Sequence, residues 1–172
     1  MRYLSIACLM ALILCFLSDV VYAAINKPKA TPSKILQGSG SIIGGVAGKG
    51  FSLLDLRKSQ DIKHKVERVV FDIGNLQGRT LKGLPGYYHA QMLQNPSRLV
   101  IDFSQMPASK VNAHEIQKRL KGSMFIKSTE LALDPIDQSL SVVLFLKNNP
   151  KAKVFQVSGV KNTSKVVLDL TL

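Results

Sequence analysis

One short pattern occurs three times in this sequence, and it limits the folded part of the chain to β-structure. A basic residue, a valine two positions on and an aspartate two positions further stand in residues 68–72, 98–102 and 165–169. The residues between them are large and apolar, so each segment alternates with a period of two. That period is typical of a strand with one face in the core and the other in solvent. The outward charged residues of the three strands are Arg68 and Asp72, Arg98 and Asp102, and Lys165 and Asp169.

A fourth run, residues 141–146, keeps the apolar alternation but places Ser141, Val143 and Phe145 at the outward positions. The runs at 68 and 98 bracket a strand-like segment, and so do those at 141 and 165. This spacing predicts an internal duplication. Short strands separated by turn residues favour a β-sandwich or a barrel.

One helix is expected among the strands. Asn112 can cap its N-terminus, with Glu115 three residues later as the second half of a capping box. Ile116 and Leu120 form its buried stripe, and Gly122 ends it.

The first 23 residues have the pattern of a secretory signal peptide. Arg2 precedes an apolar run over residues 4–17, and Val21 and Ala23 supply the small residues of a cleavage site after Ala23. Cys8 and Cys15 both lie inside this segment, so the mature chain has no thiol. We expect export to the periplasm, with membrane contact only through the signal peptide before its cleavage.

Residues 24–60 read as a basic linker rich in glycine and proline, ahead of a β domain at residues 61–172. The spacing of Gly40, Gly44 and Gly48 would also suit a small-residue helix-packing face, although the apolar stretch is too short to span a membrane. Residues 51–56 are expected to dock on the domain as a short strand or turn.

The chain carries 23 Lys and Arg against 11 Asp and Glu, a formal net charge of +12. Such an excess favours an anionic partner, and secretion argues against nucleic acid. The three histidines stand apart, without the spacing of a metal site. No cofactor, metal or catalytic residue is therefore expected, and the chain is predicted not to be an enzyme.

Residues 87–106 read Tyr-Tyr-His-Ala-Gln-Met-Leu-Gln-Asn-Pro-Ser-Arg-Leu-Val-Ile-Asp-Phe-Ser-Gln-Met. This resembles the signature of the AMIN domain, in which a Tyr-led strand is followed by Leu-x-Asn-Pro-x-Arg-Leu-Val-x-Asp. The strands at residues 68–72 and 165–170 look like that family's flanking strands, so the resemblance covers residues 65–172.

The resemblance implies an all-β fold, a β-sandwich of two related four-stranded sheets, which agrees with the predicted duplication. AMIN domains occur in periplasmic proteins, in front of N-acetylmuramoyl-L-alanine amidases and type IV pilus secretins. There they bind peptidoglycan and target the protein to the envelope, without being catalytic. In this sequence no amidase or secretin module follows the predicted domain.

The outward charges have two readings that are compatible. If the first two patterned strands were neighbours, Arg68 would pair with Asp102 and Asp72 with Arg98. Alternatively, the arginines bind carboxylates of peptide stems, and the aspartates accept hydrogen bonds from sugar hydroxyls or amides.

Two further residues, Tyr88 and Asn95, are candidates for the expected ligand face. Tyr87 and Tyr88 point to opposite faces, and the exposed one could stack on a sugar ring; we place Tyr88 among the candidates. Asn95 begins a turn with the proline that follows it.

The expected function is a non-enzymatic AMIN-type module that binds peptidoglycan and localises itself or a partner in the cell envelope. Two alternatives remain open: a protein–protein adaptor in a type IV pilus or secretin assembly, and an activator of a separate cell-wall amidase.

Overall fold

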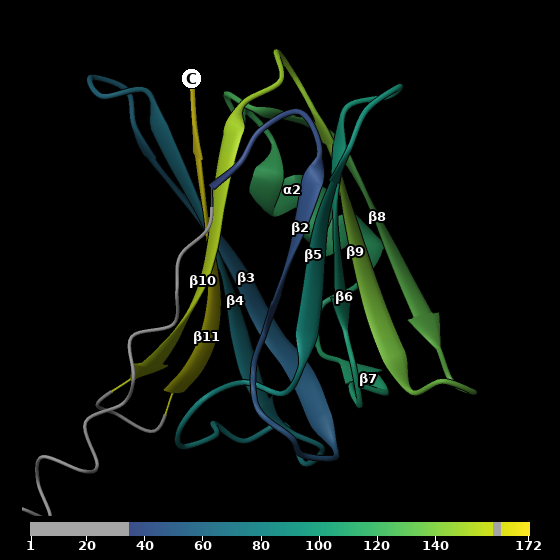
Figure 1. Ribbon diagram of the computed structural model, residues 1–172. Helices are drawn as coiled ribbons and strands as arrows, with labels where there is room; N and C mark the ends of the chain where they lie inside the picture. Colours follow the sequence, from purple (N-terminus) through teal and green to yellow (C-terminus); the bar gives the residue numbers. More distant parts are fainter. Residues whose placement is uncertain (1–34, 160–162) are drawn as a thin grey trace, which may run out of the picture. The chain divides into compact units, whose positions relative to one another are not determined.

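Two β-sheets and one short helix make up residues 35–159 and 163–172, the part of the chain that the computed structural model describes (Figure 1). The predicted signal peptide and the start of the predicted linker lie outside these residues. The elements in chain order are β1 (Ile35–Leu36), β2 (Gly40–Gly44), β3 (Phe51–Asp61), β4 (Val66–Asn75), β5 (Tyr88–Leu93), β6 (Arg98–Phe103), β7 (Ala108–Ser109), α2 (Ala113–Leu120), β8 (Ile126–Asp134), β9 (Ser139–Leu146), β10 (Lys151–Gly159) and β11 (Thr163–Thr171).

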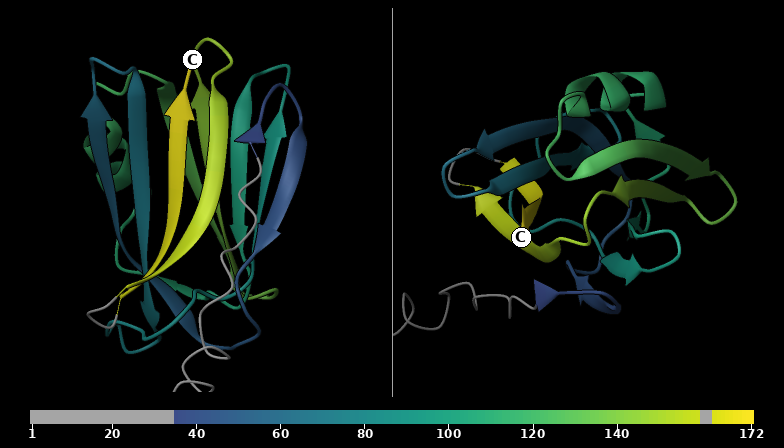
Figure 2. Two further views of the ribbon diagram at one scale, coloured as in Figure 1. Left: turned by 60° about the vertical axis from the view of Figure 1, so that its left-hand side comes forward. Right: turned by 90° about the horizontal axis from the view of Figure 1, so that it is seen from above.

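The strands form a sandwich-like pair of packed layers (Figure 2). The six-stranded sheet has the order β1-β10-β11-β4-β3-β7, and the five-stranded sheet has the order β2-β5-β6-β9-β8. Four antiparallel hairpins supply most of the strands: β3–β4 and β10–β11 in the first sheet, β5–β6 and β8–β9 in the second. The mostly β architecture with one short helix is therefore confirmed, whereas the expectation of four strands in each sheet is wrong, because the sheets have six and five strands.

The core lies between the inner faces of the two sheets, and it contains the apolar positions that the alternation assigned to it. Val69, Phe71 and Ile73 of β4 are at most 1% exposed. The rings of Phe71 and Phe103, which belong to different sheets, have centroids 5.6 Å apart. Tyr88 adds a second ring against Phe103, at 6.4 Å. The contact between Phe71 and Phe103 therefore joins the two layers through apolar surface, and Tyr88 extends it within the five-stranded sheet.

The predicted linker over residues 24–60 is wrong for residues 35–36, 40–44 and 51–60, because these residues belong to β1, β2 and β3. β3 pairs with β4 along its whole length and buries Phe51, Leu53 and Leu56. The β domain therefore includes residues before the predicted boundary at residue 61. Residues 51–56, expected to dock on the domain as a short strand or turn, form the first part of the longer strand β3.

The high glycine content led to the prediction of a linker, but in this fold the glycines allow close packing and turns. A Cβ at Gly44 would collide with the side chain of Tyr88, so only glycine allows β2 to pack over that ring. Gly50 has φ +71, a left-handed conformation that glycine adopts without strain and that leads the chain into β3. Neither role leaves a signal that distinguishes these glycines from those of a flexible tether.

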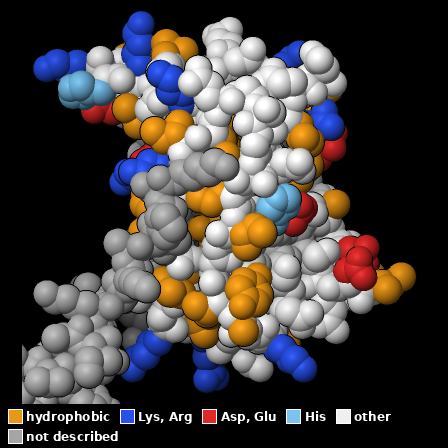
Figure 3. Space-filling view, in the orientation of Figure 1, with side chains coloured by type: hydrophobic (Ala, Val, Ile, Leu, Met, Phe, Trp, Pro, Cys, Tyr) orange, Lys and Arg blue, Asp and Glu red, His pale blue; other side chains and the backbone are white. Residues whose placement is uncertain are grey.

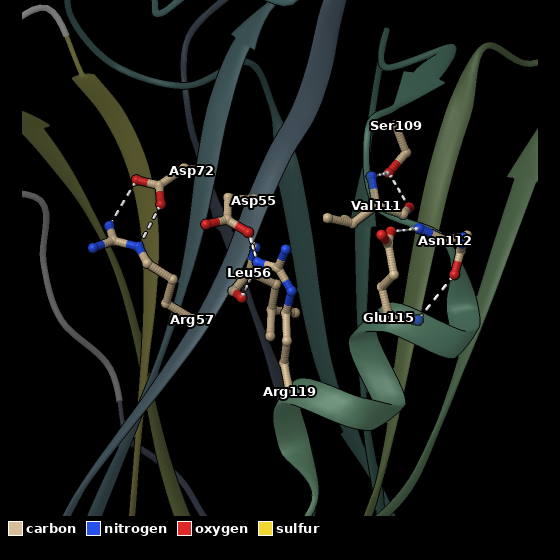
Figure 4. Close-up of polar contacts among 9 residues, drawn as sticks. All are labelled: Asp55, Leu56, Arg57, Asp72, Ser109, Val111, Asn112, Glu115 and Arg119. Carbon is tan, nitrogen blue, oxygen red and sulfur yellow. Dashed lines mark hydrogen bonds and ion pairs between the residues drawn. The ribbon is translucent and has the colours of Figure 1, made fainter.

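The helix α2 has the ends that the sequence predicts. Asn112 accepts a hydrogen bond from the Glu115 amide, and the Glu115 carboxylate accepts one from the Asn112 amide (Figure 4). Ile116 and Leu120 are buried. Arg119 forms an ion pair with Asp55 of β3, so α2 is tied to the six-stranded sheet.

Candidate functional site

Four of the predicted site residues come together on the outer face of the six-stranded sheet. Because β11 pairs with β4, Asp169 lies opposite Arg68 and Lys165 lies opposite Asp72. Nε and Nη2 of Arg68 donate to the two carboxylate oxygens of Asp169 at 2.6 and 2.8 Å. This two-pronged contact raises the pKa of Arg68.

Asp72 is engaged from both of its neighbouring strands. Arg57 of β3 donates to its two oxygens at 2.7 and 2.9 Å (Figure 4), and the Lys165 ammonium lies 3.9 Å away. The sequence prediction missed Arg57 because it assigned this residue to the linker. Both aspartates of this face are thus already held by cations of the chain itself.

The predicted pairs of Arg68 with Asp102 and of Asp72 with Arg98 are wrong. β4 lies between β11 and β3, whereas β6 belongs to the other sheet. The expectation of cross-strand ion pairs is confirmed in kind, but with different partners.

Phe155 of β10 adds an aromatic ring to this face. The guanidinium carbon of Arg68 lies 5.8 Å from its ring centroid, and Nζ of Lys153 lies 5.5 Å from it. Both distances suit cation–π attraction. The ring is therefore occupied by neighbouring cations, as the two aspartates are.

The outer face of the five-stranded sheet carries Arg98 and Asp102, and it is organised differently. Asp102 accepts a hydrogen bond from the Ser141 hydroxyl at 2.5 Å, and Nδ1 of His89 lies 3.9 Å from its other oxygen. Phe145 stands opposite Arg98 across β6 and β9. Arg98 donates only to the carbonyl of Pro96, at 3.4 Å, and among the described residues it has no carboxylate partner.

Hydrophobic side chains extend this face toward β2. Ile43 lies opposite His89 and is 71% exposed, and Tyr87, just before β5, is 51% exposed. Figure 3 shows hydrophobic side chains gathered over β2 and β5. The face thus combines an unpaired guanidinium, an aromatic residue and exposed apolar surface.

Two other predicted candidates are placed away from these charges. Tyr88 is 1% exposed, so the prediction that it contacts a ligand is wrong, and Tyr87 is the exposed member of the pair. Burial raises the pKa of Tyr88 to about 12, and its hydroxyl makes no hydrogen bond with the residues that the structure describes. Asn95 lies in the exposed turn between β5 and β6, as predicted, with φ 57.

Glu67 is a buried carboxylate that the sequence prediction did not single out. It is 0% exposed, and its oxygens accept hydrogen bonds from the Ser123 hydroxyl, the Met124 amide and the Gln60 side chain. These contacts attach the segment after α2 to β4. The sequence did indicate its burial, because the alternation along β4 places Glu67 on the same inward face as Val69.

No known family model matches the chain, and a search of curated proteins finds no match. Within residues 35–159 and 163–172, no three His, Cys, Asp or Glu side chains lie close enough together to hold a metal ion. In the same residues, no helix has the length and hydrophobicity needed to cross a membrane.

Proposed function

We propose that this protein is a non-catalytic AMIN-type module of the periplasm, which binds peptidoglycan and localises itself or a partner in the cell envelope. The outer face of the five-stranded sheet is the proposed ligand face. Support comes from the predicted signal peptide and from the motif of residues 87–106, which spans the β5–β6 hairpin at the centre of that face. Export after cleavage behind Ala23 would deliver the module to the compartment that holds its ligand.

The proposal includes the internal duplication of the AMIN fold. The order β3-β4-β11-β10 in one sheet corresponds to β8-β9-β6-β5 in the other, if each strand is matched with the fifth strand along the chain. Register supports this match residue by residue. Arg68 opposite Asp169 corresponds to Ser141 opposite Asp102, and each of these pairs forms a hydrogen bond.

The second pair of matched positions carries the functional argument. Asp72 opposite Lys165 in one sheet corresponds to Phe145 opposite Arg98 in the other. The carboxylate that would neutralise Arg98 is thus replaced by an aromatic ring. Because the charges of the six-stranded sheet satisfy one another, the single observation that selects the ligand face is the unpaired guanidinium of Arg98.

Peptidoglycan offers chemistry that suits this face. Its peptide stems carry carboxylates, which a guanidinium binds through two parallel hydrogen bonds. Its sugar rings have apolar faces that stack on aromatic side chains, here Phe145 and the exposed Tyr87. Asp102 can accept hydrogen bonds from sugar hydroxyls or amides through lone pairs that Ser141 leaves free.

Sedimentation with purified peptidoglycan sacculi tests the proposal. The wild-type protein should pellet at physiological salt, and Arg98→Gln should weaken binding by about tenfold, the value of a hydrogen bond to a charged group. Phe145→Asp should weaken binding as well, because it places a carboxylate opposite Arg98. Arg98 would then have an acidic partner on the neighbouring strand, as Lys165 has Asp72 in the other sheet. Arg57→Gln, which changes an exposed arginine of the other sheet, is the matched control.

Two results would contradict the proposal. One is a wild-type protein that stays in the supernatant; the other is equal binding by Arg98→Gln and Arg57→Gln. Raising the salt concentration to about 0.5 M should weaken binding steeply, because exposed charges are then screened within a few ångströms. If salt does not weaken binding, stacking of sugar rings on Phe145 and Tyr87, and not the charge of Arg98, is the main source of affinity.

A second candidate function, that of an adaptor in a pilus or secretin assembly, rests on the edge strand β8. β8 is the last strand of its sheet, and Leu133 and Ile136 near its end are 47% and 90% exposed. An uncovered edge can pair with a strand of another protein. Crosslinking from Leu133 to a secretin in intact cells would favour this function, and stimulated wall hydrolysis in a mixed assay would favour activation of an amidase.

A further inference from the structure

A groove of about 560 Å³ is lined by residues of α2 and by the first residues of β8, two elements that contact each other. Its lining includes none of Tyr87, Arg98 and Phe145 of the proposed peptidoglycan face. Buried Leu120 and Ile126 contribute apolar surface to it. We call it the α2–β8 groove. The other residues that line it are His114, Gln117, Lys118, Lys121, Gly122, Lys127, Ser128, Thr129 and Lys147.

The charge of the α2–β8 groove is of one sign. Four lysines and no acidic residue line it, and none of these lysines takes part in an ion pair among the described residues. Lysines that lack acidic neighbours repel one another, and an anionic ligand would relieve that repulsion.

Side chains donate to three backbone carbonyls in the segment that follows α2. Lys58 donates to the Lys121 carbonyl at 2.7 Å, Gln60 donates to the Gly122 carbonyl at 3.1 Å, and Lys147 donates to the Ser123 carbonyl at 2.7 Å. These three carbonyls are therefore satisfied within the protein.

A hydroxyl in the groove wall lacks a partner. The side-chain oxygen of Thr129 is buried and makes no hydrogen bond within the described residues. Such groups are rare in folded proteins and call for a ligand or another explanation. Thr129 lines the groove together with the lysines, and its unpartnered hydroxyl is the donor that a ligand there would use.

We propose that the α2–β8 groove binds a phosphate group. Ammonium groups bind phosphate as compact point charges, whereas planar carboxylates are matched best by guanidinium groups, and no arginine lines this groove. The volume is that of a small-molecule site. A lipid headgroup and a soluble or polymer-borne glycerol phosphate present the same chemistry to these residues.

Titration of the ¹⁵N-labelled protein with inorganic phosphate and with glycerol phosphate tests the site, against sodium chloride at matched ionic strength. Both phosphates should produce saturable shifts in the amides of residues 118–129. The double variant Lys121→Gln, Lys127→Gln should weaken the affinity by about tenfold or more. Lys82→Gln, in the loop between β4 and β5, is the matched control and should leave the affinity unchanged.

Thr129→Val separates binding from folding. It removes the unpaired hydroxyl and keeps the branched shape, so the free energy of unfolding should stay the same or rise while phosphate affinity falls by about tenfold. Shifts that do not saturate, that chloride reproduces, or that all variants share would overturn the site.

Vesicles identify the source of the phosphate. Binding to phosphatidylcholine vesicles only when they contain phosphatidylglycerol, lost in the lysine double variant, assigns the groove to a lipid headgroup. Binding of glycerol phosphate without vesicle binding assigns it to a soluble or polymer-borne phosphate, and binding of neither overturns the proposal. Arg98→Gln should leave phosphate binding intact, so failure of the phosphate site is distinguishable from failure of the proposed peptidoglycan face.

Discussion

Replacement of Glu67 by alanine should lower the free energy of unfolding by about 2–5 kcal/mol, because it leaves buried hydrogen-bond donors without their acceptor. The side chain is 0% exposed and accepts hydrogen bonds from Gln60 at 2.7 Å, from the Met124 amide at 2.8 Å and from the Ser123 hydroxyl. Each donor left buried without an acceptor costs about 1–3 kcal/mol. Ser123 can recover part of that loss by rotating its hydroxyl, and the Met124 amide cannot move without the backbone.

Glu67→Gln refines the test because it keeps the volume and one acceptor oxygen. Its new amide donor meets donors from the loop after α2, so we expect a loss of about 1–3 kcal/mol, smaller than for alanine. Glu130→Gln, on the exposed part of β8, is the control and should lie within about 0.5 kcal/mol of wild type.

Urea unfolding followed by circular dichroism measures both effects, and hydrogen exchange adds a local readout. In Glu67→Gln the amides of residues 122–126 should exchange faster than in wild type, since Glu67 attaches that segment to β4. At the same denaturant concentration the exchange rates of the β4 amides should be unchanged. An alanine variant within 1 kcal/mol of wild type, or unchanged exchange in this segment, would refute the reasoning.

Three further predictions concern local contacts. Tyr88→Phe should match wild type within about 0.5 kcal/mol at neutral pH, because the hydroxyl makes no hydrogen bond within the described part of the chain. Burial raises the pKa of Tyr88 from 10.0 to about 12, so between these pH values the folded wild type keeps a proton that the unfolded chain loses. The free energy of unfolding of the wild type should therefore fall by up to about 1.4 kcal/mol per pH unit as the pH rises through this range. Urea titrations should show no such contribution in Tyr88→Phe. Asn112→Ala should cost about 1 kcal/mol in thermal unfolding through loss of the α2 cap, and an unchanged melting temperature would contradict this. A double-mutant cycle on Arg68 and Asp169 should give a coupling of about 0.5–1 kcal/mol that shrinks with added salt, whereas a salt-independent coupling would be inconsistent with an exposed ion pair.

Local features of this fold were readable from the sequence because each depends on neighbours along the chain. The outward positions of β4, β6, β9 and β11 follow from a period of two, and the structure confirms them. The capping box at Asn112 and Glu115 depends on residues three apart, and it too is confirmed. Glu67 lay on the predicted inward face, but the period does not reveal which donors a buried carboxylate will meet.

The linker prediction failed where local composition conflicts with packing. Glycines at positions 44 and 50 look like a tether, yet one makes room for Tyr88 and the other turns the chain into β3. The buried surface that makes these strands stable comes from residues distant in sequence. Only the tertiary structure therefore shows that strands before residue 61 belong to the β domain.

The sequence by itself determined which side of each strand faces the core, and only the tertiary structure decided which strands are neighbours. Arg68 was placed outward by its period, but its partner became Asp169 because β11, and not β6, lies beside β4. Strand order also left Arg98 opposite Phe145 and brought α2 against β8 to form a lysine-lined groove. Alternation is a property of a few consecutive residues, whereas strand pairing is settled by which arrangement buries the inner faces of both sheets together.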